Sequence, residues 1–406
     1  MLQVITPEEV LNLIKEEFKT IEGSSENISI EQCVGRILAA DITASEYVPD
    51  FDRSLVDGYA LRAKDTFGCS DSIPAVLKID GEVLMGKPAD FTVSADSCGI
   101  IPTGGAVPEG ADAVQMLEYA EEYGDGTVGI MKPAAPGAHM IFRGDDVFPG
   151  KTVLHKGRVL RAMDIGALAA MGITKIPVRP LLRIGIISTG DEIIPYQEKP
   201  MPGQIRDVNT ALLHSAVSSP CTLVKEYGIV RDQEEILLSA VRSAMAENDL
   251  ILISGGSSAG EKDATAKVID TLGELLVHGI AMKPGKPTII GKADETVLFG
   301  LPGHPVAAFF VTQLFVLPLI DRLCGCSSQY KESIPAELTE NISANDGRAQ
   351  YLAVRLGTEE QKMLVTPIRT KSGLISSLAE ADGYISISRD CEGMAAGTTV
   401  NVFLFR

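Results

Sequence analysis

Apolar residues recur with a helical period near the start of the chain, from Val10 to Phe18. The sequence TPEE at residues 6–9 comes directly before them, with threonine at the cap position, proline at the first helical position and glutamate three residues after the cap. Such a sequence is typical of a helix start. We therefore predict an amphipathic helix here. The pattern predicts two further helical segments, over residues 30–40 and 161–171.

The region between these helical segments has a different pattern. Residues 46–144 are rich in glycine, proline and valine, and stretches such as residues 75–79 alternate in polarity. This alternation is typical of β-strands. We predict a β domain over residues 46–146, inserted into a discontinuous helical N-terminal domain that comprises residues 1–45 and 147–180.

From residue 181 to residue 327, short apolar runs alternate with segments of helical period. Continuous apolar runs bounded by turn residues are typical of strands buried on both faces of a parallel sheet. Their alternation with helices predicts a doubly wound α/β domain. The predicted strands are 183–188, 223–229, 250–254 and 296–299, and the predicted helices are 209–217, 233–246, 264–276 and 305–323.

In the last part of the chain, residues 328–406, the period of the apolar positions falls towards two. A series of short alternating segments separated by turn residues predicts a small C-terminal β barrel or sheet. The predicted strands are 336–341, 349–356, 363–368, 384–388 and 399–405.

The composition restricts the classes of partner. The 406 residues carry a formal net charge of −18 and no tryptophan. Nucleic acids and anionic membranes favour a basic face, and base stacking needs aromatic side chains, so we expect neither partner. The seven cysteines are scattered without a C-x-x-C pair, which favours reduced thiols in a cytoplasmic protein. We expect no signal peptide and no stretch of membrane-span length.

The strand predicted at residues 250–254 leads into a glycine-rich loop that ends at Asp263. Glycine tolerates positive φ and has no Cβ, so the loop can bring backbone N–H groups close to an anion. Glu261 and Asp263 add carboxylates, and carboxylates beside a phosphate require a cation between them. We therefore predict a phosphate site bridged by Mg²⁺, with a glycine-rich connection that binds no ligand as the alternative. The loop residues predicted to bind the anion are Ser254, Gly255, Gly256, Ser257 and Gly260.

Six further clusters place glycine beside polar or charged residues. Among them, the KPGKP sequence carries two lysines on a turn stiffened by prolines, which in so acidic a chain suits contact with an anion. Each cluster alone also suits a turn or a helix cap. Together they predict a ligand cleft between domains, where binding sites are common. The clusters are residues 52–60, 101–105, 143–146, 188–192, 283–287 and 301–305.

The ordered set of clusters resembles one known family. It is similar to the molybdopterin molybdenumtransferases, the MoeA family, whose relatives include the C-terminal part of gephyrin. The resemblance extends over nearly the whole chain, and the order of the motifs makes it specific although each motif alone is weak. The motifs are FDRSLVDGYA, IIPTGGAVPEGADAVQMLE, FRGDDVFPG, STGDE, ISGGSSAGEKD, MKPGKP and GLPGHPVAAF.

The resemblance implies an enzyme of molybdenum cofactor synthesis. Such an enzyme takes adenylylated molybdopterin and molybdate and yields molybdenum-loaded cofactor and AMP, with the assistance of Mg²⁺. The resemblance also implies four domains and a homodimer, in which the N-terminal domain serves dimerisation. The cleft is then expected between the α/β domain of one subunit and the β insertion of the other.

The resemblance also implies roles for single residues. The catalytic positions are Asp57, Thr103, Asp146, Glu192, Asp232 and Asp263, of which Glu192 and Asp263 would hold the metal. The substrate-binding positions outside the glycine-rich loop are Arg143, Lys283, Lys286, Pro302, Pro305 and Ser372. The chain departs from the family at two positions, with His304 where many members have asparagine and Gly279 where some have lysine. We interpret His304 as a polar cap or contact.

Two other functions fit parts of the sequence. The α/β domain also resembles that of the molybdopterin adenylyltransferases, which would make the chain an ATP-consuming enzyme. A scaffold that binds the cofactor without catalysis is the other alternative, as in the anchoring role of gephyrin. The insertion, the C-terminal β domain and the set of charged cleft residues favour the transferase. The adenylyltransferase of the same pathway is then a candidate partner.

Overall fold

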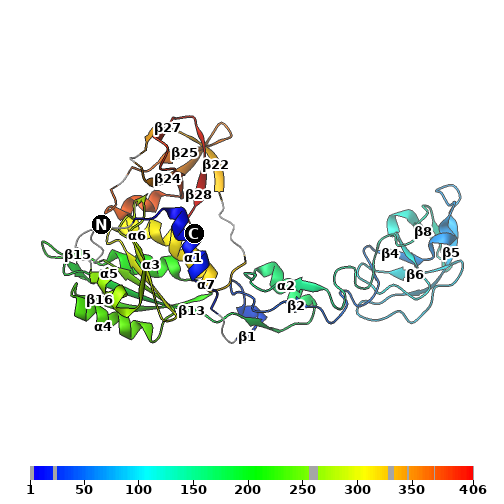
Figure 1. Cartoon of the computed structure of the whole chain (residues 1–406). Helices are drawn as coiled ribbons and strands as arrows, with labels where there is room; N and C mark the ends of the chain where they lie inside the picture. Colours follow the sequence, from blue (N-terminus) through cyan, green and yellow to red (C-terminus); the bar gives the residue numbers. More distant parts are fainter. Residues whose placement is uncertain are drawn as a thin grey trace. The chain divides into compact units, whose positions relative to one another are not determined.

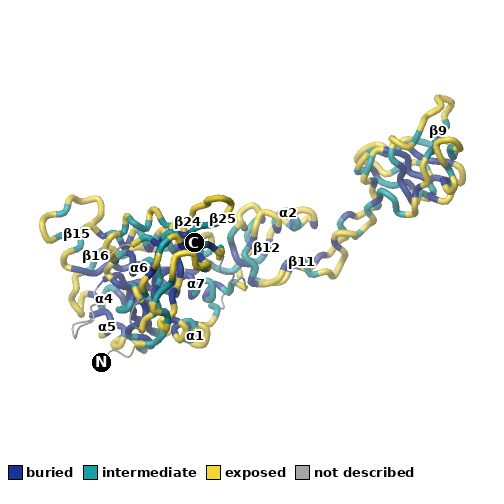
Figure 2. Tube along the Cα trace, turned by 90° about the horizontal axis from the view of Figure 1, so that it is seen from above, coloured by how far each residue is buried: buried dark blue, intermediate teal, exposed yellow. Residues whose placement is uncertain are grey.

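The computed structural model describes residues 4–21, 25–255, 264–327, 333–344, 347–369 and 371–405. The chain divides into two compact units. The first consists of Met1–Ala40, Lys156–Arg161 and Lys175–Arg406, and the second of Asp41–His155 and Ala162–Thr174. Figure 1 labels their elements, and Figure 2 shows that each unit has its own buried interior.

Helix α1 (Pro7–Glu17) forms at the predicted position, and its capping box is confirmed. The Thr6 side chain accepts a hydrogen bond from the Glu9 N–H, and the Glu9 carboxylate accepts one from the Thr6 N–H at 2.6 Å. The apolar face of α1 joins the core of the α/β sheet through Val10, Ile14 and Phe18.

The helix predicted over residues 30–40 is wrong. Only a 3₁₀ turn forms, at Ile30–Gln32. Gly35 has a φ of +80°, which ends helical geometry, and Ile37 and Leu38 then form β-bridges as extended chain. Both of these side chains are buried, so tertiary packing overrides the local helical period. Nearby, β1 (Glu26–Ser29) pairs with β12 (Lys175–Val178).

The α/β domain contains a six-stranded sheet. Four strands are parallel, as predicted, but β20 and β18 are antiparallel, so the sheet is mixed. Only Asp294 and Glu295 connect β20 to β21, and a two-residue connection closes a hairpin, whereas parallel neighbours need a long crossover. In spatial order the strands are β16 (Thr222–Val230), β13 (Leu182–Thr189), β17 (Leu250–Ser254), β21 (Thr296–Leu301), β20 (Ile289–Ala293) and β18 (Glu274–His278).

Helices cover both faces of this sheet, which confirms the doubly wound architecture. Buried residues of α1, α3 (Val208–Val217) and α6 (Pro305–Val311) share one core with Ile184 and Ile186 of β13. Buried residues of α4 (Glu234–Met245) and α5 (Ala264–Leu272) share the other core with Ile187. Because successive side chains of β13 point to opposite faces of the sheet, each side chain at the end of the strand faces one of these two cores.

Helix α5 is shorter than the predicted helix 264–276, because it ends at Leu272 and strand β18 begins at Glu274. Gly273 lies between the two elements. A Cβ at this glycine would lie 2.2 Å from the carbonyl oxygen of Lys292, so the close approach of helix end and strand β20 requires glycine.

The helix predicted over residues 305–323 forms as α6, a π-helical turn (Thr312–Val316) and α7 (Leu317–Leu323). Pro318 has no N–H to donate four residues back, which favours a wider turn before it. By length and composition, the helical segment Pro305–Leu323 is long and apolar enough to span a membrane. The expectation that no stretch reaches membrane-span length is therefore wrong. In the most apolar 18-residue window of this segment, 78% of the window is buried inside the protein, as in a core helix.

The second unit contains the predicted β insertion. A six-stranded sheet runs in the order β7 (Ala113–Met116), β4 (Gly58–Leu61), β6 (Ser97–Ile101), β5 (Ala75–Glu82), β9 (Thr127–Ile130) and β8 (Ala120–Glu122). The predicted third helix is confirmed as α2 (Ala162–Ala170). Short paired strands complete the unit: β2 (Ile42–Thr43) with β11 (Thr152–Leu154), and β3 (Arg53–Ser54) with β10 (Met140–Ile141).

The C-terminal β domain is a closed five-stranded barrel, as predicted. The strands follow the order β24 (Ala349–Glu359), β25 (Lys362–Pro367), β22 (Ser333–Leu338), β28 (Thr399–Leu404) and β26 (Gly383–Ile387), and β26 pairs back with β24. Strand β19 (Met282–Lys283) of the α/β domain extends this sheet beside β24, and β23 (Ile342–Ser343) pairs with β27 (Gly393–Met394).

Candidate functional site

The carboxyl ends of three parallel strands meet at one edge of the α/β sheet. Ser188 of β13 is the register partner of Ser254 of β17, and Ser254 is the partner of Leu301 of β21. In open α/β sheets ligands bind at this edge, outside the carboxyl ends of the strands. The predicted loop, the STGDE sequence and the LPGHP sequence therefore begin beside one another.

Side chains at the start of helix α3 hold all three of these strand ends by hydrogen bonds. The Asp207 carboxylate caps α3 by accepting from the Thr210 N–H at 3.0 Å, and it also accepts from the Ser188 hydroxyl at 3.0 Å. The Asn209 amide donates to Ser254 Oγ at 2.7 Å and to the Gly303 carbonyl oxygen at 2.9 Å. Sequence reasoning missed both Asp207 and Asn209.

Glycine is required at the end of β17. Gly255 has a φ of +99°, and a Cβ there would lie 2.0 Å from the Thr189 carbonyl oxygen. Gly303 also lies close to it, since a Cβ at Gly303 would be 3.7 Å from Gly255 Cα. The strand ends therefore approach one another closely as bare backbone. The remaining predicted loop residues, Gly256, Ser257, Gly260 and Asp263, lie outside the described residues, and so does Glu261.

Three carboxylates gather at the ends of β13 and β16. The Gly190 N–H donates to the Val230 carbonyl at 3.3 Å, which brings the turn after β13 beside the end of β16. The pKa of Asp232 is raised by partial burial and then by the negative charges of Asp191 and Glu192. The predicted residues Glu192 and Asp232 are therefore electrostatic neighbours, and both are exposed.

The KPGKP turn reaches the same edge, because β20 begins where β21 ends. The Lys286 carbonyl accepts from the Ile280 N–H at 2.9 Å, and Lys283 belongs to strand β19. The alternative of a solvated hairpin is wrong, since a Cβ at Gly285 would lie 2.8 Å from Val311 Cγ2 of α6. The turn is packed against α6, while the Lys283 side chain is exposed.

The C-terminal barrel contributes residues to this edge as well. Ser372 Oγ lies 3.0 Å from His304 Nδ1, and the Ser372 carbonyl accepts from the Val306 N–H at 3.1 Å. His304 is thus a contact, as predicted, and its side chain makes no capping hydrogen bond to α6. Lys283 is the register partner of Gln350 in β24. Pro302 is buried after β21, and Pro305 begins α6.

In the second unit, Asp57 and Thr103 lie together. The Thr103 N–H donates to the Asp57 carboxylate at 2.7 Å. The neighbouring backbone is fixed by the Gly104 N–H, which donates to the Ser54 carbonyl at 2.8 Å. Asp57 is exposed, so its carboxylate is presented at the surface rather than in an apolar interior.

The Arg143 turn forms a second polar cluster in the same unit. The Arg143 guanidinium donates to Asp50 at 2.8 and 3.0 Å and stacks 4.1 Å over the Tyr47 ring. The Asp146 backbone joins the turn through its N–H, which donates to the Val48 carbonyl at 3.1 Å. The Asp146 carboxylate is exposed. The second unit therefore presents four of the predicted residues in two polar clusters, built from the loops before β4, after β6 and after β10.

Comparison with known proteins identifies the family. Three family models match in succession: the MoeA N-terminal region (domains I and II) over residues 5–172, a probable molybdopterin-binding domain over 185–322, and the MoeA C-terminal region (domain IV) over 335–405. A molybdopterin biosynthesis protein of Methanocaldococcus jannaschii is 35% identical over 93% of this chain and 92% of its own length. This chain belongs to the MoeA family.

Other MoeA-family relatives agree with this assignment. A protein of Bacillus subtilis named molybdopterin molybdenumtransferase is 30% identical, and the match covers 95% of this chain and 91% of that protein. The crystal structure of the molybdopterin biosynthesis MoeA protein from Pyrococcus horikoshii OT3 matches with a TM-score of 0.88 and 32% identity, over 99% of this chain and 100% of that one. The resemblance stated from the motifs is therefore confirmed.

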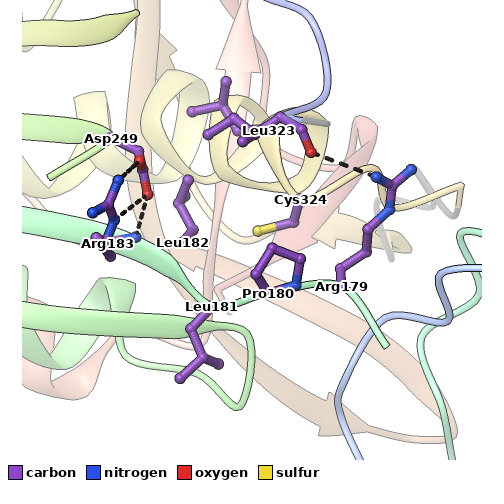
Figure 3. Close-up of a pocket in the computed structure, with 9 residues that line it drawn as sticks. Arg179, Pro180, Leu181, Leu182, Arg183, Asp249, Leu323 and Cys324 are labelled. Atoms are coloured by element: carbon purple, nitrogen blue, oxygen red, sulfur yellow. Dashed lines mark hydrogen bonds and ion pairs between the residues drawn. The ribbon is translucent and has the colours of Figure 1, made fainter. Parts of the chain in front are cut away.

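Two cavities lie away from these residues. One, of about 890 Å³, lies between α1 and the barrel strands β24, β26 and β28. The other, of about 320 Å³, lies at the opposite edge of the α/β sheet, where β13 and β17 begin (Figure 3). Within it Arg183 pairs with Asp249 at 2.6 Å, and Arg179 donates to the Ile21 carbonyl oxygen at 3.5 Å. Among the described residues, none that the MoeA-family motifs singled out lines either cavity.

The described residues of this MoeA-family chain hold no group of three or more histidine, cysteine or acidic side chains arranged around one metal position. The three carboxylates near β13 and β16 are close enough to affect one another but do not converge. All seven cysteines are free thiols, in agreement with the prediction. A metal at this edge would need a further ligand, and Asp263, predicted as one, lies outside the described residues.

Proposed function

We propose that this chain inserts molybdate into adenylylated molybdopterin with release of AMP. Its place in the MoeA family assigns it to molybdenum cofactor biosynthesis, and curated relatives carry the name molybdopterin molybdenumtransferase. The observation that supports the reaction best is the convergence of Ser254, Lys286 and Ser372 at one sheet edge, near Glu192 and Asp232. Hydroxyls, ammonium groups and carboxylates together suit a polyanion that carries a cation.

Two kinds of group would bind the substrate anion. The hydroxyls of Ser254 and Ser372 would donate to phosphate or oxyanion oxygens. Lys283 and Lys286 would balance the remaining negative charge, and the rigid turn keeps both near the edge. In an acidic chain of net charge −18 such local cations are needed to attract a polyanion.

We include Mg²⁺ in this proposal, because the charges fit it. Partial burial raises the pKa of Asp232, and the negative charges of Asp191 and Glu192 raise it further; a divalent cation would relieve this repulsion. Glu192 and Asp263 would hold the ion, with Asp232 beside them, and the ion would polarise the phosphoanhydride and neutralise charge as AMP leaves.

The family resemblance also implies a cytoplasmic homodimer whose cleft takes residues from two copies. Under this proposal Asp57, Thr103, Arg143 and Asp146 would orient molybdate. A subunit-mixing experiment tests the shared cleft: Asp57→Asn and Glu192→Gln chains are each expected to be inactive alone. Mixed dimers should regain up to about a quarter to a half of wild-type activity, since one cleft of each mixed dimer is intact. Absence of any recovery would refute sharing of the cleft.

The reaction is tested by incubating the purified chain with adenylylated molybdopterin, Mg²⁺ and molybdate. We expect one AMP released for each molybdenum retained on the product, with no AMP released in the absence of the oxyanion. A parallel incubation with tungstate measures the preference between the two oxyanions. Consumption of ATP with molybdopterin that lacks AMP, and no metal insertion, would contradict the proposal and indicate an adenylyltransferase.

A further inference from the structure

Two serines at matched register positions make opposite hydrogen bonds. Ser188 and Ser254 face α3 from neighbouring strands. The Ser188 hydroxyl donates its proton to the Asp207 carboxylate at 3.0 Å. Ser254 Oγ instead accepts a proton from the Asn209 amide at 2.7 Å. Within the described part of the chain, the Ser254 hydroxyl donates to nothing.

The orientation of the Asn209 amide is fixed by its second contact. The atom that faces Ser254 also lies 2.9 Å from the Gly303 carbonyl oxygen. A carbonyl oxygen can only accept, so this atom is the amide nitrogen, and Ser254 must accept from it. Asn209 is 6% exposed, and among the described residues no donor reaches its Oδ1. A buried acceptor without a donor is uncommon in a purely structural network.

We propose that Asn209 is a positioning residue that keeps the Ser254 proton available to the anionic group of the substrate. The inference rests on the function proposed above, because it takes the substrate to be an adenylylated pterin with phosphate oxygens. A serine whose oxygen accepts from Asn209 turns its O–H away from α3, towards the strand ends. The hydroxyl then donates to a phosphate oxygen, as a charge-assisted bond. Ser188, whose proton is held by Asp207, takes no part in this contact.

The substitution Asn209→Asp tests the inference with almost no change of shape. A carboxylate accepts but does not donate, so the Ser254 proton turns towards it, and a negative charge is added beside the anion. We expect the KM for adenylylated molybdopterin to rise about 30-fold or more, with kcat within about threefold, because a ground-state contact is lost. Ser254→Ala should also raise the KM. The double variant should have a KM no higher than that of Asn209→Asp alone.

Asn248 provides a matched control at the other edge of the same sheet. It is also a buried asparagine, and its amide donates to the Tyr227 hydroxyl at 2.7 Å and to the Ala244 carbonyl at 2.8 Å. Asn248→Asp therefore disturbs a network of the same kind far from the strand ends. We expect similar losses of Tm in the two variants, but a rise of KM only in Asn209→Asp. Similar KM values in the two variants would overturn the inference.

Two further measurements keep the inference separate from the proposed function. Calorimetric titration with inorganic pyrophosphate measures anion binding without turnover, and we expect at least tenfold weaker binding in Asn209→Asp. If wild type binds pyrophosphate but inserts no metal, the proposed function fails while the role of Asn209 stands. If Asn209→Asp does not fold, Ser254→Ala decides, because it keeps Asn209 and removes only the hydroxyl. Unchanged pyrophosphate binding and KM in that variant would refute the inference.

Discussion

Ser372 Oγ and His304 Nδ1 lie 3.0 Å apart, and this contact joins the C-terminal barrel to the end of strand β21. The bond is reinforced by the Val306 N–H, which donates to the Ser372 carbonyl at 3.1 Å. A serine predicted to bind substrate is therefore held by His304, a residue at the end of a neighbouring strand.

We expect His304→Ala to loosen the Ser372 segment without unfolding the protein. A hydrogen bond of this kind contributes about 0.5–1.5 kcal/mol, so the KM for molybdate should rise roughly 2- to 10-fold. Hydrogen exchange at the Val306 amide should quicken. His214→Ala is the control, because His214 also bonds a side chain, Glu226 at 2.6 Å, but lies on α3 away from the barrel. Equal KM effects in the two variants would contradict the assignment.

A methyl group at Gly255 is expected to disrupt the strand ends. Gly255→Ala forces a side chain into a φ of +99° and into contact with the Thr189 carbonyl, so we expect a loss of at least about 1–3 kcal/mol in the free energy of unfolding. Gly303→Ala meets no atom of the described residues closer than 3.7 Å and should change the free energy of unfolding by no more than about 0.5 kcal/mol. Urea denaturation of both variants measures the difference. Comparable losses of unfolding free energy in the two variants would contradict the close approach of Gly255 to the Thr189 carbonyl.

The raised pKa of Asp232 predicts a pH-dependent effect on stability. Because the folded-state pKa lies above the unfolded value, the ionised carboxylate destabilises the fold at neutral pH, and protonation relieves this as pH falls through the raised pKa. Asp232→Asn should therefore be slightly more stable than wild type at pH 7, by up to about 0.5 kcal/mol for so exposed a group. The difference should vanish in acid. A stability gain that persists at pH 3 would contradict this cause.

Removal of the proposed metal ligand should separate metal binding from folding. We expect Glu192→Gln to keep the wild-type Tm in the absence of metal, since Glu192 is exposed. Added Mg²⁺ should raise the Tm of wild type more than that of the variant, and AMP release should fall about 100-fold or more. Glu198→Gln, in the loop between β14 (Ile193–Ile194) and β15 (Ile205–Arg206), is the control. Equal Mg²⁺ shifts in all three proteins would argue against a cation at Glu192.

Much of the site was predictable because its signals are local. The apolar run 250–254 bounded by glycines predicts a buried strand that ends at a ligand edge, and β17 occupies those residues. The motif order identified the family, and the alternation of strands with helices predicted the α/β domain. These features depend on residues close in sequence, where periodicity and turn chemistry act.

The missed features depend on contacts between distant segments. Asn209 acquires its role only because α3 lies against the ends of β17 and β21, which no spacing within 207–210 reveals. The aspartate at position 207 was the available signal, since it caps the helix that follows. Likewise, the direction of β20 follows from a two-residue connection, and Leu38 is held as extended chain by bridging partners far along the sequence.

The account depends most on a polyanionic pterin nucleotide binding at the carboxyl edge of the α/β sheet. Its most direct test is a crystal structure of the chain with adenylylated molybdopterin. We predict phosphate oxygens within hydrogen-bonding distance of the Ser254 hydroxyl, with Lys286 beside them. Phosphates bound instead in the cavity between α1 and the barrel, with the strand ends vacant, would contradict the account.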